Sequence, residues 1–225
     1  MLKKEPKAII KASGKRGWVL EPDAKRLLSI SGIDVPRFLW AKSCEEAVRF
    51  AEKIGYPVVG KLVSPEALHK SDVGGVVVGI DSDQNLEKTF HRFSSFKGFA
   101  GMLVEEMVGG TELIAGAKMD YQFGPVILLG MGGTAVEIYQ DTALRMAPLK
   151  ETDVESMLKG LKAHELLKGY RGSQPVNLKE LVRTLMAFSG LVMDLEGYFE
   201  SIDLNPVMCS STRCVAADAR IMLQS

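Results

Sequence analysis

Cysteine, histidine and long apolar runs are scarce in this sequence. The 225 residues include three cysteines, none in a C-x-x-C pair, so neither a disulfide framework nor a thiolate zinc site is indicated. The longest uncharged apolar run, residues 123–136, is rich in glycine and shorter than the ~20 residues that a membrane-spanning helix needs. No apolar segment typical of a signal peptide follows the basic N-terminus. We therefore expect reduced cysteines and a cytoplasmic location.

An excess of charge of one sign is also absent. The chain has 28 Lys and Arg against 28 Asp and Glu, which gives a net charge of zero. Surfaces that bind duplex nucleic acid or anionic membranes usually show a basic excess, so neither partner is expected. Hydrophobic residues make up 46% and charged residues 25%, which excludes disorder over most of the chain. The length suggests one domain or two compact lobes.

Local patterns predict a mixture of helices and strands without strict β-α-β alternation, which indicates an α+β fold with mixed, partly antiparallel sheets. Ser43 with Glu46 and Asn177 with Glu180 have the spacing of capping boxes at helix starts, and Thr152 with Glu155 repeats it. Further helices are expected at 22–31 and 86–95. Strands are expected at 57–63, 73–80, 102–107, 112–119, 126–129, 201–204 and 214–217. Residues 1–21 begin with many lysines and are expected to form a solvated basic arm ahead of a single domain, 22–225.

Glycine is abundant, with 22 residues, and it clusters beside the predicted strands at 74–75, 109–110 and 130–133. Glycine lets backbone N–H groups approach a phosphate, although glycines at strand ends also simply form turns. No P-loop motif is present. Residues 130–135 fit G-x-G-x-x-A, but a dinucleotide site requires a helix to begin directly afterwards. Residues 136–142 are rich in β-branched side chains and predict a strand and turn, so we reject the dinucleotide interpretation.

The polar segment before the first glycine pair contains His69. A loop histidine with an ordinary pKa of ~6.5 is largely neutral at cytoplasmic pH, so a ring nitrogen is available as a nucleophile toward phosphorus. The alternative is an ordinary exposed loop residue. His91 and His164 lie in helical, charged surroundings, and we interpret both as surface residues.

Taken in order, the motifs form a specific series. They are the segments 61–65, 69–76, 105–114, 123–126, 130–133, 203–206 and 218–221, with Asp141 and Arg145. In this series the chain resembles the ATP-grasp β subunit of NDP-forming acyl-CoA synthetases and, more distantly, succinyl-CoA synthetase β. The resemblance extends over about residues 22–223. It implies an ATP-grasp fold with lobes of about 36–103 and 104–225, the second including helix 22–31, and residues of both lobes binding ATP or ADP with Mg²⁺.

The resemblance also implies which residues bind the nucleotide. Lys61 is expected to bridge the phosphates, and Gly74 with Gly75 to cap the β and γ phosphates through backbone N–H groups. Glu112 is expected to hold the ribose hydroxyls. A snorkelling strand lysine and a solvated carboxylate are the alternatives for Lys61 and Glu112, although an unpaired lysine in such apolar surroundings is costly. The hinge that contacts adenine through its backbone is expected at Glu105, Glu106, Met107 and Val108.

The remaining roles concern catalysis and metal. His69 corresponds to the histidine that this family phosphorylates, and Arg145 is expected to neutralise the phosphoryl group in transfer. Asn205 and Asp218 are expected to coordinate Mg²⁺, for which oxygen ligands are suitable. Taken alone, Asn205 also fits a simple turn.

The implied function is phosphoryl transfer in an ADP-forming acyl-CoA synthetase, an acid–thiol ligase. A CoA-binding α subunit is the expected partner, in an α₂β₂ assembly, because these residues contain no CoA-binding or ligase region. A stand-alone ATP-grasp carboxylate ligase and a regulatory ATP-grasp module are the alternatives. Two positions depart from the family pattern: Ser201 replaces a frequent Glu, and Gly60 replaces a bulkier residue, which predicts a looser strand.

Overall fold

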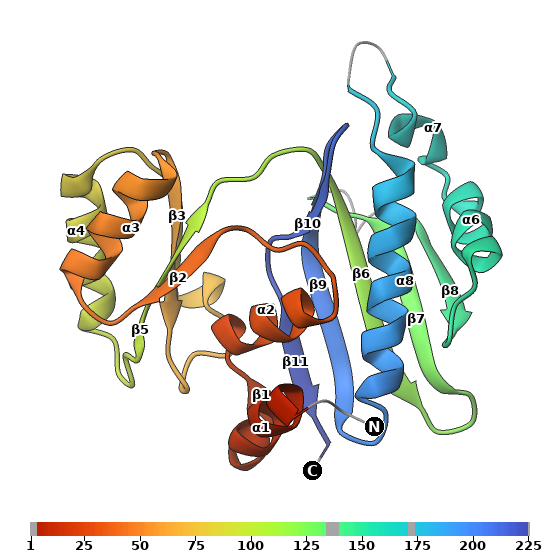
Figure 1. Ribbon diagram of the computed structural model, residues 1–225, viewed down its shortest axis with the longest axis horizontal. Coiled ribbons are helices and arrows are strands. Elements are labelled where there is room, and N and C mark those ends of the chain that lie inside the picture. Colours follow the sequence, from red (N-terminus) through yellow and green to blue (C-terminus); the bar gives the residue numbers. More distant parts are fainter. Residues whose placement is uncertain (1–3, 134–139, 171–173, 225) are drawn as a thin grey trace. The chain divides into compact units, whose positions relative to one another are not determined.

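The computed structural model describes residues 4–133, 140–170 and 174–224. The chain forms two compact units (Figure 1). Unit 1 comprises Met1–Val35 and Gly109–Ser225, and unit 2 comprises Pro36–Val108. The second boundary lies after Val108 rather than after residue 103, because the last strand of unit 2 continues to Glu106.

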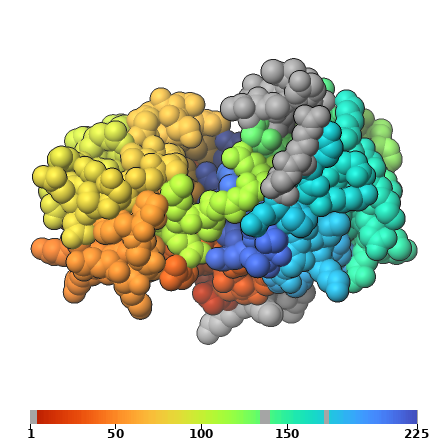
Figure 2. Space-filling model, turned by 90° about the horizontal axis from the view of Figure 1, so that it is seen from above, coloured from red at the N-terminus to blue at the C-terminus, as the bar shows by residue number. Residues whose placement is uncertain are grey.

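Unit 2 is a four-stranded antiparallel sheet with two helices packed together on one of its faces (Figure 1). The strand order is β2-β5-β3-β4. The strands are β2 (Phe38–Ala41), β3 (Val58–Val63), β4 (Val76–Ile80) and β5 (Gly101–Glu106), and the helices are α3 (Cys44–Ile54) and α4 (Asp83–Ser94). Leu62, Met102 and Phe93 are among the buried side chains that join the sheet to the helices. In Figure 2 this unit is the closely packed region coloured from orange to yellow-green.

Helix α3 shows how the local sequence determines an element of unit 2. Ser43 is the N-cap, and its Oγ accepts a hydrogen bond from Glu46 N at 3.2 Å. The Glu46 carboxylate in turn accepts from Lys42 N at 2.7 Å, one residue before the partner that an ideal capping box predicts. The helix ends at Gly55, whose φ of 88° is a conformation that glycine adopts without strain. The predicted helix start is confirmed.

Unit 1 is built on a seven-stranded sheet in which every pairing among the described strands is antiparallel. The strand order is β1-β11-β9-β6-β7-β8, with β10 paired to β9. The strands are β1 (Trp18–Val19), β6 (Thr111–Asp120), β7 (Gly124–Met131), β8 (Thr142–Met146), β9 (Phe199–Cys209), β10 (Cys214–Ala216) and β11 (Arg220–Leu223). The helices are α1 (Lys4–Ser13), α2 (Glu21–Ile30), α6 (Glu151–Gly160), α7 (His164–Leu167) and α8 (Leu178–Asp194).

The two faces of the large sheet differ in character. Along β6 and β9 alternate side chains such as Leu113, Ala115, Ile202 and Leu204 are buried in a core shared with α8, which runs along this face in Figure 1. The intervening side chains of the same strands are partly or fully exposed on the other face, as the alternation of a strand requires. We call the two sides the helix-covered face and the open face. Glu112 and Asn205, two of the polar residues predicted for unit 1, lie on the open face.

The N-terminal segment is not the solvated arm that its charge predicts. Residues Lys4–Ser13 form α1, in which Ile10 is buried and Ile9 is partly buried against the core of unit 1. These two isoleucines give the helix an apolar side that the neighbouring lysines obscure in the sequence.

Three further elements expected from the sequence are the helix at Thr152, the strand and turn at 136–142, and the helix from Asn177. The N-cap of α6 is Lys150, two residues before Thr152, and Lys150 N donates to Asp153 Oδ2 at 2.9 Å. The strand and turn expected at 136–142 are described only from residue 140, and the rest of this segment lies outside the described residues. The helix expected from Asn177 is confirmed, since Asn177 Oδ1 accepts from Glu180 N at 3.2 Å.

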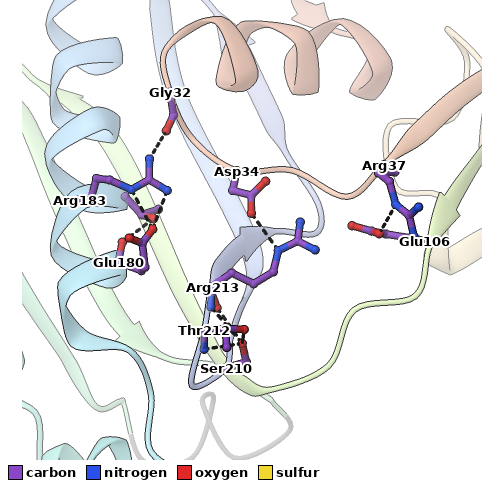
Figure 3. Close-up of polar contacts among 10 residues, drawn as sticks. Gly32, Asp34, Arg37, Glu106, Glu180, Arg183, Ser210, Thr212 and Arg213 are labelled. Atoms are coloured by element: carbon purple, nitrogen blue, oxygen red, sulfur yellow. Dashed lines mark hydrogen bonds and ion pairs between the residues drawn. The ribbon is translucent and has the colours of Figure 1, made fainter. Parts of the chain in front are cut away.

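The segment that follows α2 is tied back to unit 1 (Figure 3). Arg183 on α8 donates to the carbonyl oxygen of Gly32 at 2.9 Å and pairs with Glu180. Arg213 Nε donates to Asp34 Oδ2, also at 2.9 Å. Residues 31–35 therefore belong structurally to unit 1, although unit 2 begins directly after them. No helix in the described parts of the chain has both the length and the apolar content to cross a membrane.

Candidate functional site

The site residues predicted for unit 2 begin with Lys61 on β3. Its side chain is almost fully buried, and its Nζ lies 3.1 Å from Glu105 Oε2 on the neighbouring strand β5. The Glu105 carboxylate is buried as well, so the two charges offset each other's loss of hydration. The cost expected for an unpaired lysine in this apolar strand is thus avoided within the unit itself. Sequence reasoning considered only the backbone of Glu105 and missed its side chain.

The predicted hinge is only partly outside the sheet. Strand β5 lies between β2 and β3, with Glu105 opposite both Phe38 and Val59. Glu106 ends the strand; its N–H donates to Arg37 O at 2.9 Å, and its carboxylate accepts from Arg37 Nε at 2.6 Å (Figure 3). Met107 and Val108 follow the ladder, and Met107 is half exposed. Of the four residues of the expected hinge, Met107 and Val108 are therefore the two whose backbone lies beyond the sheet.

The loop that contains His69 is held at both ends. At its start Ser64 is buried, accepts from Glu66 N and donates to Lys97 O, both at 3.1 Å. At its end Arg92 on α4 donates to the carbonyl oxygen of Gly74 at 3.0 Å. His69 itself is exposed. The loop therefore presents an accessible imidazole from an anchored backbone.

The glycine pair after His69 forms a tight turn. Gly74 has a left-handed conformation (φ 64°), and its N–H donates to Ser71 O at 3.1 Å. Gly75 N donates to Lys70 O at 2.7 Å, and a Cβ on Gly75 would lie 2.9 Å from the same oxygen. Both N–H groups that were expected to cap phosphates are thus engaged within the turn. In this structure both glycines shape the loop through these two bonds.

In unit 1, Glu112 on β6 and Asn205 on β9 are exposed, on strands that pair with each other. The glycines at the end of β7 pack against Glu112. Gly132 N donates to Glu112 O at 2.7 Å, and a Cβ on Gly132 would lie 2.8 Å from the Glu112 carbonyl carbon. This close approach explains why glycine is needed at position 132, and it does so without a dinucleotide motif.

A pair of carboxylates lies near Asn205 on the open face. Asp203, two residues before Asn205, is opposite Arg220 on β11, and its Oδ2 lies 3.4 Å from Arg220 Nη2. Burial raises the pKa of Asp203; the carboxylate of Asp218 raises it further, while Arg220 opposes both effects. Asp203 and Asp218 are therefore close enough to interact electrostatically. Sequence reasoning missed Asp203, although its i, i+2 relation to Asn205 on a strand was a usable signal.

The donor chemistry of this group fits a hard divalent cation. Two carboxylates and an amide oxygen are the ligand types that Mg²⁺ prefers, and Mg²⁺ commonly takes few protein ligands and completes its shell with phosphate oxygens and waters. Within the described residues no group of three or more His, Cys, Asp or Glu side chains is arranged to hold a metal ion. Ser201 lies two residues before Asp203 on β9, so the two side chains project from the same face of the strand.

Arg145 lies on the other face of the sheet. It is opposite the buried Ile127 in the β7–β8 register, and directly opposed residues share a face. Its guanidinium donates to Leu144 O at 2.7 Å and to Ser156 Oγ on α6 at 2.8 Å. The structure therefore places Arg145 on the helix-covered face, away from the open face of Asn205.

Three further residues singled out in the sequence can be compared with the structure. A Cβ on Gly60 would lie 3.0 Å from Ile80 Cδ1, so the neighbours already fill the space and this strand is not loosened. Asp141 is buried and accepts from Lys162 N and Ala163 N at 2.7 and 2.8 Å, which is a structural role. His164 is partly buried rather than fully exposed, and its Nδ1 has no hydrogen-bond partner among the described residues.

These two antiparallel α+β units place the chain in the ATP-grasp class of folds. A family model described as the ATP-grasp domain matches residues 10–223, and the chain belongs to this family. It is 39% identical over 223 residues to acetate–CoA ligase (ADP-forming) I subunit β of Pyrococcus furiosus, with 96% of both chains covered. It is 38% identical to 4-hydroxybutyrate–CoA ligase (ADP-forming) of Nitrosopumilus maritimus, where the match covers 93% of this chain and 31% of that relative.

Solved structures show the same likeness. The dinucleotide-forming acetyl-coenzyme A synthetase 1 of Ca. Korarchaeum cryptofilum, in complex with coenzyme A and Ca-AMPCP, superposes with a TM-score of 0.90 at 38% identity, covering 97% of this chain and 99% of that chain. Another structure of that synthetase, with Mg-AMPPCP, is described with its phosphohistidine segment pointing towards the nucleotide binding site. It has a TM-score of 0.86 at 36% identity, covering 97% of this chain and 100% of that chain. The predicted ATP-grasp fold and family are confirmed.

Proposed function

We propose that this chain is the nucleotide-binding, phosphoryl-transferring subunit of an ADP-forming acyl-CoA synthetase. The overall reaction converts acyl-CoA, ADP and phosphate to carboxylate, ATP and CoA, and it is reversible. The near-complete match to the β subunit of the Pyrococcus ligase supports this assignment. A CoA-binding α subunit is the proposed partner, in an α₂β₂ assembly.

The observation that carries the proposal is the anchored loop with the exposed His69. A ring nitrogen of neutral His69 accepts the phosphoryl group, and a P–N bond forms as the donor's P–O bond breaks. In the second step a terminal phosphate oxygen of ADP attacks phosphorus, the P–N bond breaks, and the electron pair returns to the ring. The relative whose phosphohistidine segment points towards its nucleotide binding site supports this assignment.

The remaining residues bind and orient the nucleotide in this proposal. Lys61 contacts the phosphates, with Glu105 holding its ammonium in place. Met107 and Val108 supply backbone contacts to adenine, and Glu112 binds the ribose hydroxyls. For the phosphates, Gly74 and Gly75 are proposed to offer the N–H groups that now close their own turn, which requires that turn to open.

The proposal also assigns ligands to the cation and a positive charge to the transferred phosphoryl group. Asn205 and Asp218, with Asp203 beside them, are the proposed holders of Mg²⁺, which when bound neutralises phosphate oxygens. Arg145 is proposed to neutralise the phosphoryl group, and to do so its side chain must leave Ser156 on the helix-covered face.

The test is phosphohistidine formation from labelled ATP and Mg²⁺ in the presence of the α subunit. Wild type is expected to give an acid-labile, base-stable label that is absent from His69→Ala. His91→Ala is the matched control, because His91 is an exposed histidine on α4 outside the loop. Equal labelling of the His69→Ala variant contradicts the assignment of His69. Nucleotide binding without any labelling indicates a regulatory module instead.

A further inference from the structure

The most deeply buried charged side chain among the described residues has no part in the site described so far. Lys25, on α2, has a relative exposure of 0%, and Glu21, one helical turn before it, has 5%. The ammonium Nζ lies 3.1 Å from Glu21 Oε1 and donates to the carbonyl oxygen of Ala217 at 2.8 Å. A residue of α2 thus contacts the connection between β10 and β11.

Burying two charges is a poor way to gain stability. The loss of hydration offsets most of the attraction in such a pair, and apolar residues of similar volume often stabilise a protein equally well or better. The Lys25–Glu21 pair therefore points to a specific contact that an apolar side chain cannot make. The hydrogen bond from Lys25 to the main chain of Ala217 is such a contact.

Ala217 connects the two proposed cation ligands. Its N–H donates to the carbonyl oxygen of Pro206 at 2.9 Å, and its own carbonyl oxygen accepts from Lys25. Asn205 directly precedes Pro206 in the chain, and Asp218 directly follows Ala217. Ala217 is therefore bonded to β9 through its N–H and to α2 through its carbonyl oxygen. These two bonds fix the backbone directly before Asp218.

Asp34 also contacts the chain that leads to Asp218, but at residues further from it than Ala217. Ala216 N donates to the carbonyl oxygen of Asp34 at 2.9 Å, and the Asp34 carboxylate accepts from Arg213 (Figure 3). These bonds hold β10 itself and the turn before it. Lys25 bonds directly to Ala217, the residue that precedes Asp218.

We propose that Lys25 is a positioning residue for the divalent-cation site, which it serves by fixing the Ala217 peptide so that the Asp218 carboxylate shares a cation with Asn205. Glu21 keeps the Lys25 ammonium in place. This inference rests on the proposed function, because it requires a cation–nucleotide site at these two ligands. Lys25 is distant in sequence from both proposed cation ligands, Asn205 and Asp218, and the inference gives it a role in positioning one of them.

The test uses the full chain, Mn²⁺ as the probe and electron paramagnetic resonance to measure free Mn²⁺ during titration in the presence of ADP. Because Lys25→Met alone leaves the Glu21 carboxylate buried without its ammonium, the main variant is Glu21→Gln combined with Lys25→Met. Loss of a supporting contact behind a metal ligand typically costs ~10–100-fold in metal affinity. We expect Mn²⁺ affinity to fall at least about tenfold, while ADP affinity measured without metal changes little.

Ser189→Ala is the matched control. Ser189 is buried on α8 and its Oγ accepts from Leu149 N at 2.8 Å, so the variant loses a buried hydrogen bond on the helix-covered face. It is expected to melt at a lower temperature and to keep its Mn²⁺ affinity.

The outcomes separate the two claims. A wild-type chain that binds neither ADP nor Mn²⁺ overturns the proposed function and this inference with it. A wild-type chain that binds both, with unchanged Mn²⁺ affinity in the double variant, overturns the positioning role alone. An equal loss of Mn²⁺ affinity in Ser189→Ala also overturns it, because the effect then follows from general destabilisation.

Discussion

Lys61 and Glu105 form an ion pair across two neighbouring strands of unit 2, with 3.1 Å between Nζ and Oε2 and with both side chains buried. Leaving one charge of a buried pair without its partner is strongly destabilising, whereas replacing both together is much less so. The pair therefore couples the stability of unit 2 to the position of the lysine proposed to contact the nucleotide.

Removing Lys61 alone is expected to cost stability as well as binding. Lys61→Met leaves Glu105 buried and should lower the free energy of unfolding by about 3–5 kcal/mol. The double variant Lys61→Met with Glu105→Gln should recover most of that stability and still bind ADP weakly. Urea unfolding and calorimetric titration with ADP measure the two effects. Wild-type ADP affinity in the double variant would show that Lys61 does not contact the phosphates.

The turn at Gly75 is expected to control the loop of His69. In Gly75→Ala the new Cβ meets Lys70 O at 2.9 Å and Leu62 Cβ at 3.1 Å, so the turn must shift. Overpacking of this kind typically costs about 1–3 kcal/mol. We expect a clear fall in the rate of His69 phosphorylation. Samples quenched at successive times after the addition of labelled ATP measure this rate.

Gly160→Ala provides the comparison for that variant. Among the described residues, apart from the chain neighbours and the adjoining backbone of α6, nothing lies within 4 Å of a Cβ built at Gly160, at the end of α6. This variant should label at the wild-type rate. Equal rates for both alanine variants would mean that the turn geometry has no influence on phosphorylation.

Asp203 is expected to assist cation binding. Its carboxylate adds negative charge beside Asp218, and Asp203→Asn removes that charge while keeping the shape of the side chain. Titration with Mn²⁺ in the presence of ADP should show a weaker affinity, by about tenfold. An affinity equal to wild type would confine the cation to Asn205 and Asp218.

The turn between β6 and β7 should be sensitive to acid. Hydrogen bonds from Phe123 N and Gln122 N lower the pKa of Asp120 below its usual value. A lowered pKa in the folded state gives stability that is present above the unfolded-state pKa of ~3.9 and is lost as the pH falls through the folded-state pKa. The difference in unfolding free energy between wild type and Asp120→Asn should therefore be largest near neutral pH and vanish in acid. A difference that grows in acid would contradict this sign.

Local signals predicted local structure well. Ser43 and Asn177 are helix N-caps because each side chain bonds to the backbone three residues ahead, and that spacing is visible in the sequence. The same signal was misleading at Thr152, where Lys150 is the cap and Asp153 supplies the returning carboxylate. Helix α1 was missed because the lysines around Ile9 and Ile10 obscure the two apolar side chains that pack against the core.

The parts of the site that depend on strand register could not be predicted. The pairing of Lys61 with Glu105 requires β3 to lie beside β5, and the approach of Asp203 to Asp218 follows from the pairing of β9 with β11. The face on which Arg145 lies follows from its position opposite Ile127. The family resemblance predicts which residues form the proposed site, but neither it nor the sequence pattern indicated these partners.

The central claim is that this chain passes a phosphoryl group from His69 to ADP. The most direct measurement is a single-turnover chase, in which the chain is first phosphorylated, freed of nucleotide, and then mixed with ADP and Mg²⁺. We expect one ATP for each phosphohistidine, with the phosphate disappearing from the peptide that contains His69. Phosphate that stays on the protein after ADP is added, or that maps to another residue, would contradict the account.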